Sequence, residues 1–266
     1  MCRILEVSRS GFYSWLERPE SARSLANREL ARKIREIHAA NRGVYGSPRI
    51  QVALGGHCGK NRVARIMKEE GIQGKARRRF RPQTTDSKHT LAVAENLIKQ
   101  NFTAATPDQV WLADITYIHT HEGWLYLATV IDVFSRKIVG WAMADHMRKE
   151  LALDALGMAV TIRQPGPGLI HHSDRGSQYA SEAYRSALDA HGIKCSMSGV
   201  GNCYDNAMQE SFFHTLKVEY VNDANFQTRE EAKSGIFEYI EGFYNIKRLH
   251  SGLDYKTPQQ KDQEAA

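Results

Sequence analysis

The chain alternates between apolar and polar positions most regularly in its second half. Residues 110–120 (VWLADITYIHT) alternate with a period of two, residues 124–134 (WLYLATVIDVF) are almost continuously apolar, and residues 137–145 (KIVGWAMAD) form a third run rich in strand-favouring side chains. Gly123 and the pair Ser135–Arg136 fit the turns between these runs. The pattern predicts three successive antiparallel strands.

Helices and strands alternate after these three runs. A helix is predicted over residues 148–162, because its apolar side chains fall on one stripe, and QPGPG at 164–168 ends it. The segment LIHHSD at 169–174 predicts a short buried strand. A helix over 181–192 and a strand over 193–198 continue the series. This alternation predicts an α/β fold with a mixed sheet.

Two further helices are predicted near the end of the sequence. A Gly/Asn-rich loop leads into a helix from Ala207 to about Val221, and Thr228 with Glu231 predicts a capping box for a last amphipathic helix. Six aromatic side chains in these helices are expected in the core: Phe212, Phe213, Phe237, Tyr239, Phe243 and Tyr244. Asp205 and Asn206, before the first of these helices, suit either capping or DNA contact.

Residues 21–74 predict three short helices instead of strands. The third, NRVARIMKEEG at 61–71, follows a glycine-rich turn, so Asn61 can cap it and Gly71 can end it. The last two helices resemble a helix-turn-helix, in which the second presents basic side chains to a DNA groove. These basic residues are Arg62, Arg65 and Lys68. A small helical bundle with a solvated basic face explains the same pattern.

The charge is distributed unevenly along the 266 residues. Residues 1–100 carry 21 Lys/Arg against 9 Asp/Glu, a net charge of +12, whereas residues 101–266 carry 15 against 21, a net charge of −6. Such a basic segment indicates a polyanionic partner, because each neutralised phosphate releases counterions. Residues 75–81 (KARRRFR) are the most basic, and Arg77, Arg78 and Arg79 are expected to contact DNA phosphates. A solvated tail is the alternative interpretation of this run.

Composition excludes several other classes of protein. With 42% apolar and 25% charged residues, the chain is globular and not fibrous or disordered. It has neither an apolar run long enough for a membrane span nor the apolar stretch of a signal peptide, so we expect a cytoplasmic protein with no membrane partner. Its four cysteines lack the spacing of a zinc site or a disulfide framework.

Three carboxylates fall at predicted strand ends or helix starts. They are Asp114 in the first strand, Asp174 directly after the fourth, and Glu210 in the first turn of the late helix. Carboxylate oxygens suit Mg²⁺ or Mn²⁺, and two such ions about 4 Å apart can assist phosphoryl transfer. Lys217 lies seven residues beyond Glu210, on the same helical face, where it can hold a substrate phosphate. Asp132 is expected to make structural hydrogen bonds, and His171 and His172 precede Asp174 on a buried strand.

These residues lie in blocks that resemble a known family. The blocks include WLADITYI, IDVFSRKIVGW, HHSDRGSQYAS, GNCYDNAMQESFFHTLK and RLHSGLDYKTPQQ, with YGSPRI and NRVARIM upstream, and 35 residues separate Asp174 from Glu210. The chain is similar to insertion-sequence transposases of the orfB type, whose catalytic core is that of retroviral integrases and belongs to the DDE class. The resemblance implies an RNase H-like fold, the triad Asp114, Asp174 and Glu210 and a basic position at Lys217.

The resemblance also implies an organisation and an activity. We expect a helix-turn-helix-like DNA-binding domain at 1–74, a basic linker at 75–106, an RNase H-like integrase core at 107–222 and a C-terminal helical extension at 223–266. The implied activity is Mg²⁺-dependent DNA cleavage at the 3′ end of an element, followed by strand transfer, by two-metal phosphoryl transfer. The implied setting is an oligomer on DNA at the bacterial nucleoid, with an orfA-type partner or a frameshift fusion. The alternatives are an RNase H-like nuclease or resolvase and a non-catalytic repressor.

Overall fold

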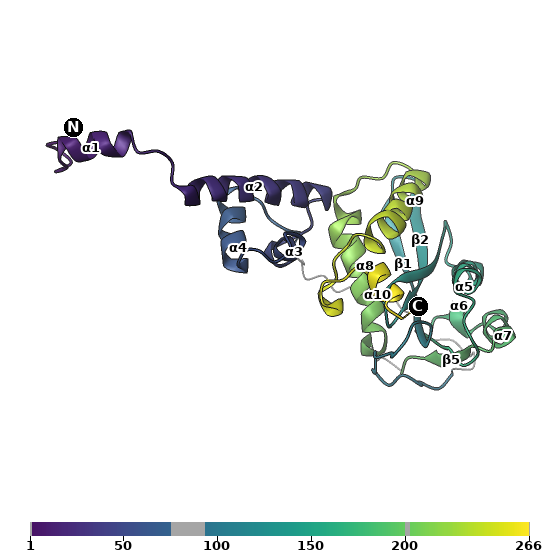
Figure 1. Ribbon diagram of the computed structural model, residues 1–266. Coiled ribbons are helices and arrows are strands. Elements are labelled where there is room, and N and C mark those ends of the chain that lie inside the picture. Colours follow the sequence, from purple (N-terminus) through teal and green to yellow (C-terminus); the bar gives the residue numbers. More distant parts are fainter. Residues whose placement is uncertain (1, 76–93, 200–202, 266) are drawn as a thin grey trace. The chain divides into compact units, whose positions relative to one another are not determined.

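A five-stranded mixed sheet organises the larger of two compact units in the computed structural model, which describes residues 2–75, 94–199 and 203–265. The units comprise residues 1–74 and 75–266. The strand order is β3-β2-β1-β4-β5 (Figure 1). The strands are β1 (Val110–Thr120), β2 (Gly123–Asp132), β3 (Ile138–Ala144), β4 (Ile170–Ser173) and β5 (Lys194–Met197). The first three are antiparallel, as predicted.

β4 pairs with only the first part of β1. The rest of β1 therefore forms an edge of the sheet on that side. β4 pairs with β1 in parallel only from Val110 to Ala113, and β5 pairs in parallel with β4. The antiparallel partner β2 continues along β1 as far as Thr120. Asp114 is therefore the first residue of β1 past the end of β4.

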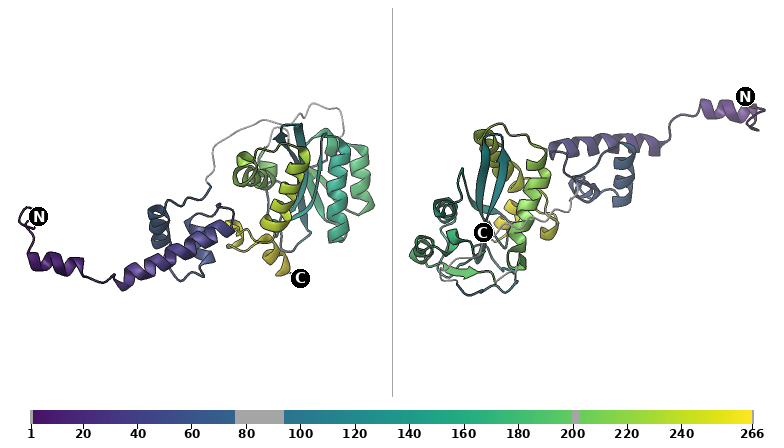
Figure 2. Two further views of the ribbon diagram at one scale, coloured as in Figure 1. Left: turned by 90° about the horizontal axis from the view of Figure 1, so that it is seen from above. Right: turned by 180° about the vertical axis from the view of Figure 1, so that it is seen from behind.

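Helices cover both faces of this sheet (Figure 2). One face carries α5 (Lys149–Arg163), α6 (Ser177–Ala180) and α7 (Glu182–Ala190), whose apolar side chains form one core with β1, β2 and β3. Gly140 on β3 permits close contact with α5, because a Cβ there would lie 2.3 Å from the Ala155 carbonyl oxygen. α8 (Ala207–Glu219) and α9 (Arg229–Phe237) pack against β1 and β2, on the opposite face.

Of the two hydrogen bonds that the predicted capping box at the start of α9 requires, one forms and the other is replaced by a different bond. The Thr228 hydroxyl accepts from the Glu231 N–H at 3.1 Å, whereas the Glu231 carboxylate accepts from the Gln227 N–H at 2.7 Å. The predicted return bond of the capping box is therefore wrong. A full capping box forms instead at α10 (Pro258–Gln263), between Thr257 and Gln260.

α9 runs directly into a π-helical segment, Glu238–Tyr244, that the apolar pattern did not reveal. Five of the six aromatic side chains expected in the core are buried: Phe212 and Phe213 on α8, and Tyr239, Phe243 and Tyr244 in the π-helical segment. The prediction for Phe237 is wrong, because this side chain is 51% exposed. Phe237 is the last residue of the regular α-helix, where the spacing that places side chains on one face changes.

A buried ion pair ties the segment after α9 to the end of α8. The Arg248 guanidinium donates from Nε and Nη2 to the two carboxylate oxygens of Glu219, at 2.8 and 2.7 Å. The Tyr239 hydroxyl donates to the same carboxylate at 2.8 Å. Both charged side chains are almost fully buried. Helix α8 is thereby fixed at its C-terminal end by residues from the last forty of the chain.

Residues 1–74 form a separate helical unit. Its helices are α1 (Arg9–Leu16), α2 (Ala22–Ala40), α3 (Ser47–Ala53) and α4 (Lys60–Glu69). α1 was not predicted, and α2 is longer than the short helix expected. Gly59, and not Asn61, is the N-cap of α4, so that prediction is wrong, whereas Gly71, at φ +66°, does follow its end. Across the described residues of both units, each helix is too short or too polar to cross a membrane.

Candidate active site

Register brings the first two carboxylates together. Ala113 on β1 pairs with Ser173 at the end of β4, so the next residues, Asp114 and Asp174, follow side by side where β4 leaves the sheet. The Ile115 N–H donates to Asp114 Oδ1 at 2.8 Å. Burial and, next, the Asp174 carboxylate raise the pKa of Asp114 well above its ordinary value. The two carboxylates therefore lie close enough for the charge of Asp174 to disfavour the ionised form of Asp114.

The turn after β4 holds the Asp174 side chain. Its Oδ1 accepts from the Gly176 N–H at 2.9 Å. A Cβ at Gly176 would lie 3.0 Å from the same oxygen and 2.8 Å from Gln178 Oε1, so a larger residue there would require these two side chains to shift. The loop geometry thus fixes where the second carboxylate points.

Helix α8 carries the third carboxylate toward the same edge of β1. The Asn206 side-chain amide donates to the Ala113 carbonyl at 3.3 Å, and the Gln209 amide donates to the Thr129 carbonyl at 3.4 Å and to its hydroxyl. Thr129 is the β2 partner of Asp114. Glu210 is the next residue, and its side chain is exposed. The charge of Glu210 raises the pKa of Asp114, but by less than the charge of Asp174 does.

Lys217 provides a cation beside these carboxylates. Its charge opposes the rise in the pKa of Asp114, and burial lowers the pKa of Lys217 while the Asp114 carboxylate raises it. The Lys217 ammonium lies 4.8 Å from the centre of the Tyr117 ring. Asp114, Asp174 and Lys217 therefore lie near one another at the edge of β1 beyond Ala113, whereas the charge of Glu210 acts on Asp114 more weakly than that of Asp174 does.

The donor set suits a hard divalent cation only in part. Asp114 and Asp174 are close enough to repel each other, and a cation between them would relieve that repulsion. Within residues 2–75, 94–199 and 203–265, however, no three His, Cys, Asp or Glu side chains lie close enough together to hold one ion. Asp114 and Asp174 supply oxygen donors of the kind that such an ion prefers, but Glu210 does not complete a group of three with them.

The predicted DNA-binding residues of the helical unit have different surroundings. Arg62 donates from Nε and Nη2 to Asn27 Oδ1 on α2, at 3.0 and 2.8 Å, so its guanidinium is partly used inside the unit. Arg65 pairs with Glu69 one turn along α4, at 2.8 Å. Arg77, Arg78 and Arg79 lie outside the described residues.

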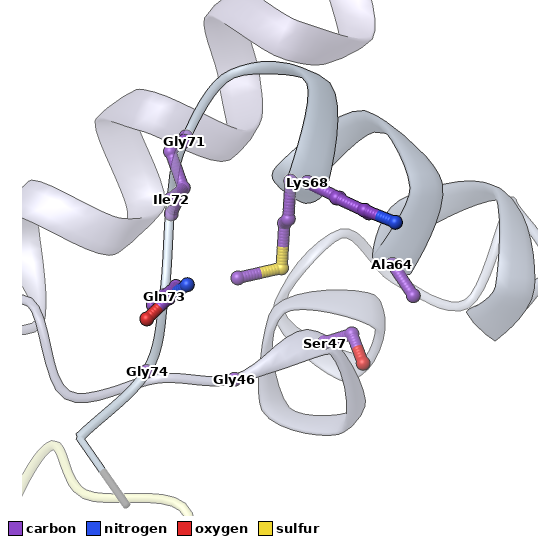
Figure 3. Close-up of a pocket in the computed structure, with 9 residues that line it drawn as sticks. Gly46, Ser47, Ala64, Lys68, Gly71, Ile72, Gln73 and Gly74 are labelled. Carbon is purple, nitrogen blue, oxygen red and sulfur yellow. The ribbon is translucent and has the colours of Figure 1, made fainter.

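Lys68 borders a pocket of about 360 Å³ in the same unit (Figure 3). The pocket lies between the start of α3, the end of α4 and residues 71–74, with Ser47 and Gln73 as further polar side chains. None of its lining residues is a carboxylate, a histidine or a cysteine. Among the described residues that line the pocket, Lys68 is the one charged side chain.

Sequence reasoning missed Tyr179, which forms part of the site's wall. Its side chain is 2% exposed, and its hydroxyl has no hydrogen-bond partner in the described part of the chain. Burial raises its pKa well above the ordinary value, and the charges of Asp114 and Asp174 add to that rise. The block SQYAS was noticed, but nothing local to it indicates that this phenol lies beside two carboxylates.

Asp132 and the two histidines have structural surroundings. Asp132 is fully buried and accepts from the Asp108 N–H at 2.9 Å and from the Ser135 N–H and hydroxyl at 2.8 and 2.7 Å, which confirms its predicted hydrogen-bonding role. His171 contacts the Tyr184 hydroxyl at 3.0 Å, and His172 lies between the hydroxyls of Ser196 and Ser198. Both histidines are core residues.

Comparison with protein families and solved structures agrees with this architecture. Family models described as "Integrase core domain" match residues 104–203 and 210–263, and one described as "HTH-like domain" matches residues 24–80. A chain of the simian T-cell lymphotropic virus intasome, solved in complex with PP2A regulatory subunit B56 gamma, superimposes with a TM-score of 0.51 at 16% identity. The match covers 85% of this chain and 73% of that one. The RNase H-like fold of integrase cores is thereby confirmed.

Relatives of similar length share much more of the sequence. The transposase for insertion sequence element IS904 of Lactococcus lactis is 46% identical over 91% of this chain and 97% of its own. Transposase InsF for insertion sequence IS3A of Escherichia coli is 42% identical over 98% of this chain and 92% of its own. A 31 kDa protein of insertion element IS600 from Shigella sonnei is 47% identical over 97% of this chain and 96% of its own. The chain belongs to the family of insertion-sequence transposases with an integrase core.

Proposed function

We propose that the chain is a DNA strand transferase that cleaves the 3′ end of its element and joins that end to another DNA, with Asp114, Asp174 and Glu210 as its catalytic carboxylates. The observation that carries the proposal is that Asp114 and Asp174 lie next to each other at one strand edge, where the charges of Glu210 and Lys217 also act on Asp114. The transposase names of the relatives support it independently.

The same carboxylates would hold two Mg²⁺ or Mn²⁺ ions, with Glu210 moving toward the aspartates. Such ions, when bound, supply activation of the attacking oxygen and stabilisation of the leaving oxygen. The chain itself supplies position: the Gly176 N–H orients Asp174, and the amides of Asn206 and Gln209 fix the start of α8. Lys217 holds the phosphate beside Asp114, in a site whose burial strengthens that attraction.

Both reactions are in-line displacements at phosphorus. In the first, water attacks and frees a 3′-OH. In the second, that 3′-OH attacks a phosphodiester of the target. Neither step needs a covalent enzyme intermediate, so no Ser or Tyr nucleophile is required, and the work of the protein is to align two DNA segments.

DNA binding beyond the site belongs to the basic part of the chain. The proposed contacts are Arg62, Arg65, Lys68, Arg77, Arg78 and Arg79, of which Arg62 first has to leave Asn27. We assign residues 1–74 to DNA binding, 75–106 to a basic linker, 107–222 to the catalytic core and 223–266 to its helical extension. An oligomer on the element ends and an orfA-type partner or fusion complete the proposed assembly.

Single-turnover cleavage and joining test the carboxylates. With a labelled duplex of the element end and Mg²⁺, Asp114→Asn, Asp174→Asn and Glu210→Gln should each slow both steps roughly a thousandfold or more, because several kcal/mol of transition-state stabilisation is lost at about 1.4 kcal/mol per decade. Asp154→Asn, on the exposed side of α5, is the matched control and should keep full activity. Asp132→Asn should lower the melting temperature without slowing chemistry in the folded fraction.

The product pattern decides between related activities. A strand transferase joins a pre-cleaved end to a second duplex, whereas an RNase H-like nuclease or resolvase of the kind considered above yields no such product. Joining that survives Asp114→Asn in a stably folded protein would overturn the assignment. Full activity after exhaustive chelation of divalent ions would overturn the proposed metal dependence.

A further inference from the structure

An aromatic strip runs along the hairpin of β1 and β2. It consists of Tyr117, His119, His121 and Trp124. The rings of Tyr117 and Trp124 meet edge to face at 5.0 Å, those of His119 and Trp124 at 5.3 Å, and those of His119 and His121 at 6.4 Å. Trp124 is 46% exposed, and both histidines are exposed. One exposed aromatic side chain is ordinary on a protein surface, but four adjoining rings, three of them exposed and Tyr117 half-buried, form a candidate binding surface.

The register explains why these rings share one side of the sheet. Tyr117 pairs with Tyr126 and His119 pairs with Trp124, so the side chains of these pairs point to the same face. Further along the strands, the same face is covered by α5, which packs on Ala113 and Ala128. The aromatic strip is the continuation of that face where Trp124 and His119 are open to solvent.

The strip is held in place by the segment before and at the start of α9. Arg229 Nε donates to the Trp124 carbonyl at 3.0 Å, and the Arg229 N–H donates to the Glu122 carboxylate at 2.8 Å. The His121 N–H donates to the Phe226 carbonyl at 3.1 Å, and its ring contacts Asn225 Oδ1 at 2.9 Å. These bonds fix the backbone of the hairpin and the His121 ring, so a ligand that binds there loses little binding energy in ordering the hairpin.

One cation links the strip to the carboxylates. The Lys217 ammonium lies over the Tyr117 ring at 4.8 Å and carries the charge that opposes that of Asp114. Lys217 can reach both because β1 has no β4 partner beyond Ala113. A cation that tracks phosphate beside a row of exposed π faces is the composition of surfaces that bind single-stranded nucleic acid.

We propose that the aromatic strip binds an unpaired DNA base, by stacking on Trp124 next to Tyr117, while Lys217, which lies over the Tyr117 ring, holds the phosphate of the same strand. The ligand class is a single strand or a frayed duplex end, read by its π face and not by its base sequence. The inference rests on the proposed function, because it concerns the DNA on which the carboxylates act. It adds a strand-separating role that a fully paired substrate does not need.

Binding of a short fluorescein-labelled oligothymidine to the full chain, by fluorescence anisotropy, tests the strip against a duplex of equal length. Trp124→Ala should weaken single-strand binding roughly 5- to 100-fold, since stacking contributes about 1–3 kcal/mol per base, and change duplex binding less than about twofold. Trp124→Phe should restore most of the loss, because a ring is retained. Phe237→Ala, which removes another exposed aromatic side chain of the same unit, is the matched control and should have no effect.

Photocrosslinking with 5-iodouracil in the oligothymidine locates the contact. We expect the crosslinked peptide to contain Trp124 or Tyr117. Equal losses for single strand and duplex, no loss in Trp124→Ala, or crosslinks confined to residues 1–74 would overturn the proposal. Loss of self-association in sedimentation, with single-strand binding intact, would identify the strip as a protein contact and also overturn it.

The outcome is separable from that of the proposed function. If the wild-type chain joins no DNA while Trp124→Ala still loses single-strand binding, the strip stands and the transferase assignment fails. If joining depends on Asp114 while Trp124→Ala binds single strands normally, the transferase stands and the strip fails.

Discussion

Two tyrosines beside the sheet differ in whether their hydroxyls are paired. The Tyr184 hydroxyl contacts His171 Nε2 at 3.0 Å, whereas that of Tyr179 has no partner in the part of the chain the structure describes. Both side chains are almost fully buried. A buried donor without an acceptor costs about 1–3 kcal/mol, and so does the loss of one member of a buried pair.

Tyr179→Phe should therefore leave the free energy of unfolding of the metal-free protein unchanged or raise it by about 1 kcal/mol, because it removes an unpaired polar group. Tyr184→Phe should lower it by about 1–3 kcal/mol, because His171 loses its partner. Urea unfolding near neutral pH measures both. Equal destabilisation by the two variants would show that the Tyr179 hydroxyl is paired in solution.

His171 makes stability depend on pH. Burial and then the charge of His172 lower the pKa of His171 from 6.5 to about 3. The folded state therefore does not bind a proton that the unfolded chain binds below pH 6.5. The contribution of His171 to the free energy of unfolding is fully present above that pH and is lost as the pH falls toward 3. His172, with a pKa lowered to about 4 by burial, acts in the same direction, whereas the raised pKa of the Asp114 carboxyl acts in the opposite one.

His171→Gln isolates one of these contributions. The variant should flatten the decline in unfolding free energy between about pH 6 and pH 4 by up to about 1.4 kcal/mol per pH unit, the value for one proton. Denaturant titrations at several pH values supply the slopes, and the comparison does not depend on the stability of the variant at neutral pH. An unchanged slope would contradict the assignment of a neutral, buried imidazole.

At the scale of the elements, a glycine of β3 and a glycine of α5 have opposite surroundings. A Cβ at Gly140 would lie 2.3 Å from the Ala155 carbonyl oxygen and 2.7 Å from the Ala159 Cβ, whereas one at Gly157, on the outer side of α5, would meet nothing within 4 Å. The two positions therefore separate packing from helix propensity within one pair of elements.

Gly140→Ala should lower the free energy of unfolding by about 1–3 kcal/mol or more, because α5 has to move away from the sheet. Gly157→Ala should raise it by about 0.5–1 kcal/mol, because alanine favours the helix. Thermal and urea unfolding of the two variants check this. A neutral Gly140→Ala would mean that the helix shifts on the sheet at little cost.

Periodicity predicted the elements whose structure depends on burial of one face. β1, β2, β3, α5 and α8 lie where the apolar pattern placed them, within a few residues. The pattern failed where the backbone changes its repeat, as in the π-helical segment after Phe237, since that segment does not follow the spacing of 3.6 residues. It failed again at Glu231, whose carboxylate accepts from the Gln227 N–H and not from the Thr228 N–H of the predicted capping box.

The residues of the candidate site also fall into two groups, those that the sequence could predict and those that it could not. The three carboxylates and Lys217 of the candidate site could be predicted from their spacing and from the blocks that carry the resemblance, because helical and strand repeats decide which side chains share a face. Tyr179 and the bond between Arg62 and Asn27 could not, because each depends on a segment distant along the chain. No local pattern encodes such contacts.

At the scale of the whole molecule, the charge asymmetry predicts how DNA binding responds to salt. Residues 1–100 carry a net charge of +12, and three consecutive arginines, Arg77, Arg78 and Arg79, follow the helical unit. Each phosphate that a basic side chain neutralises adds about 0.9 to the slope of log K against log salt concentration.

Replacing these three arginines by glutamine should reduce that slope by up to about three and leave sequence preference nearly unchanged. Fluorescence anisotropy of the full chain on duplex DNA at several salt concentrations measures the slope. Replacing Lys149 and Lys194, two exposed lysines of the acidic half, is the control and should leave it nearly constant. A slope that does not change in the arginine variant would place the phosphate contacts elsewhere.

The buried pair of Glu219 and Arg248 has a consequence for how damaged copies of such an element decay. A gene that stops before codon 248 still encodes Asp114, Asp174, Glu210 and Lys217, yet its product leaves the Glu219 carboxylate buried without its guanidinium. An uncompensated buried charge costs about 3–5 kcal/mol, a large share of the roughly 5–15 kcal/mol that holds a domain folded. The truncated product should accumulate as insoluble protein, and Glu219→Gln in the full chain should reproduce part of the defect. A survey of genomes that counts genes with an intact triad would therefore include copies whose product does not fold.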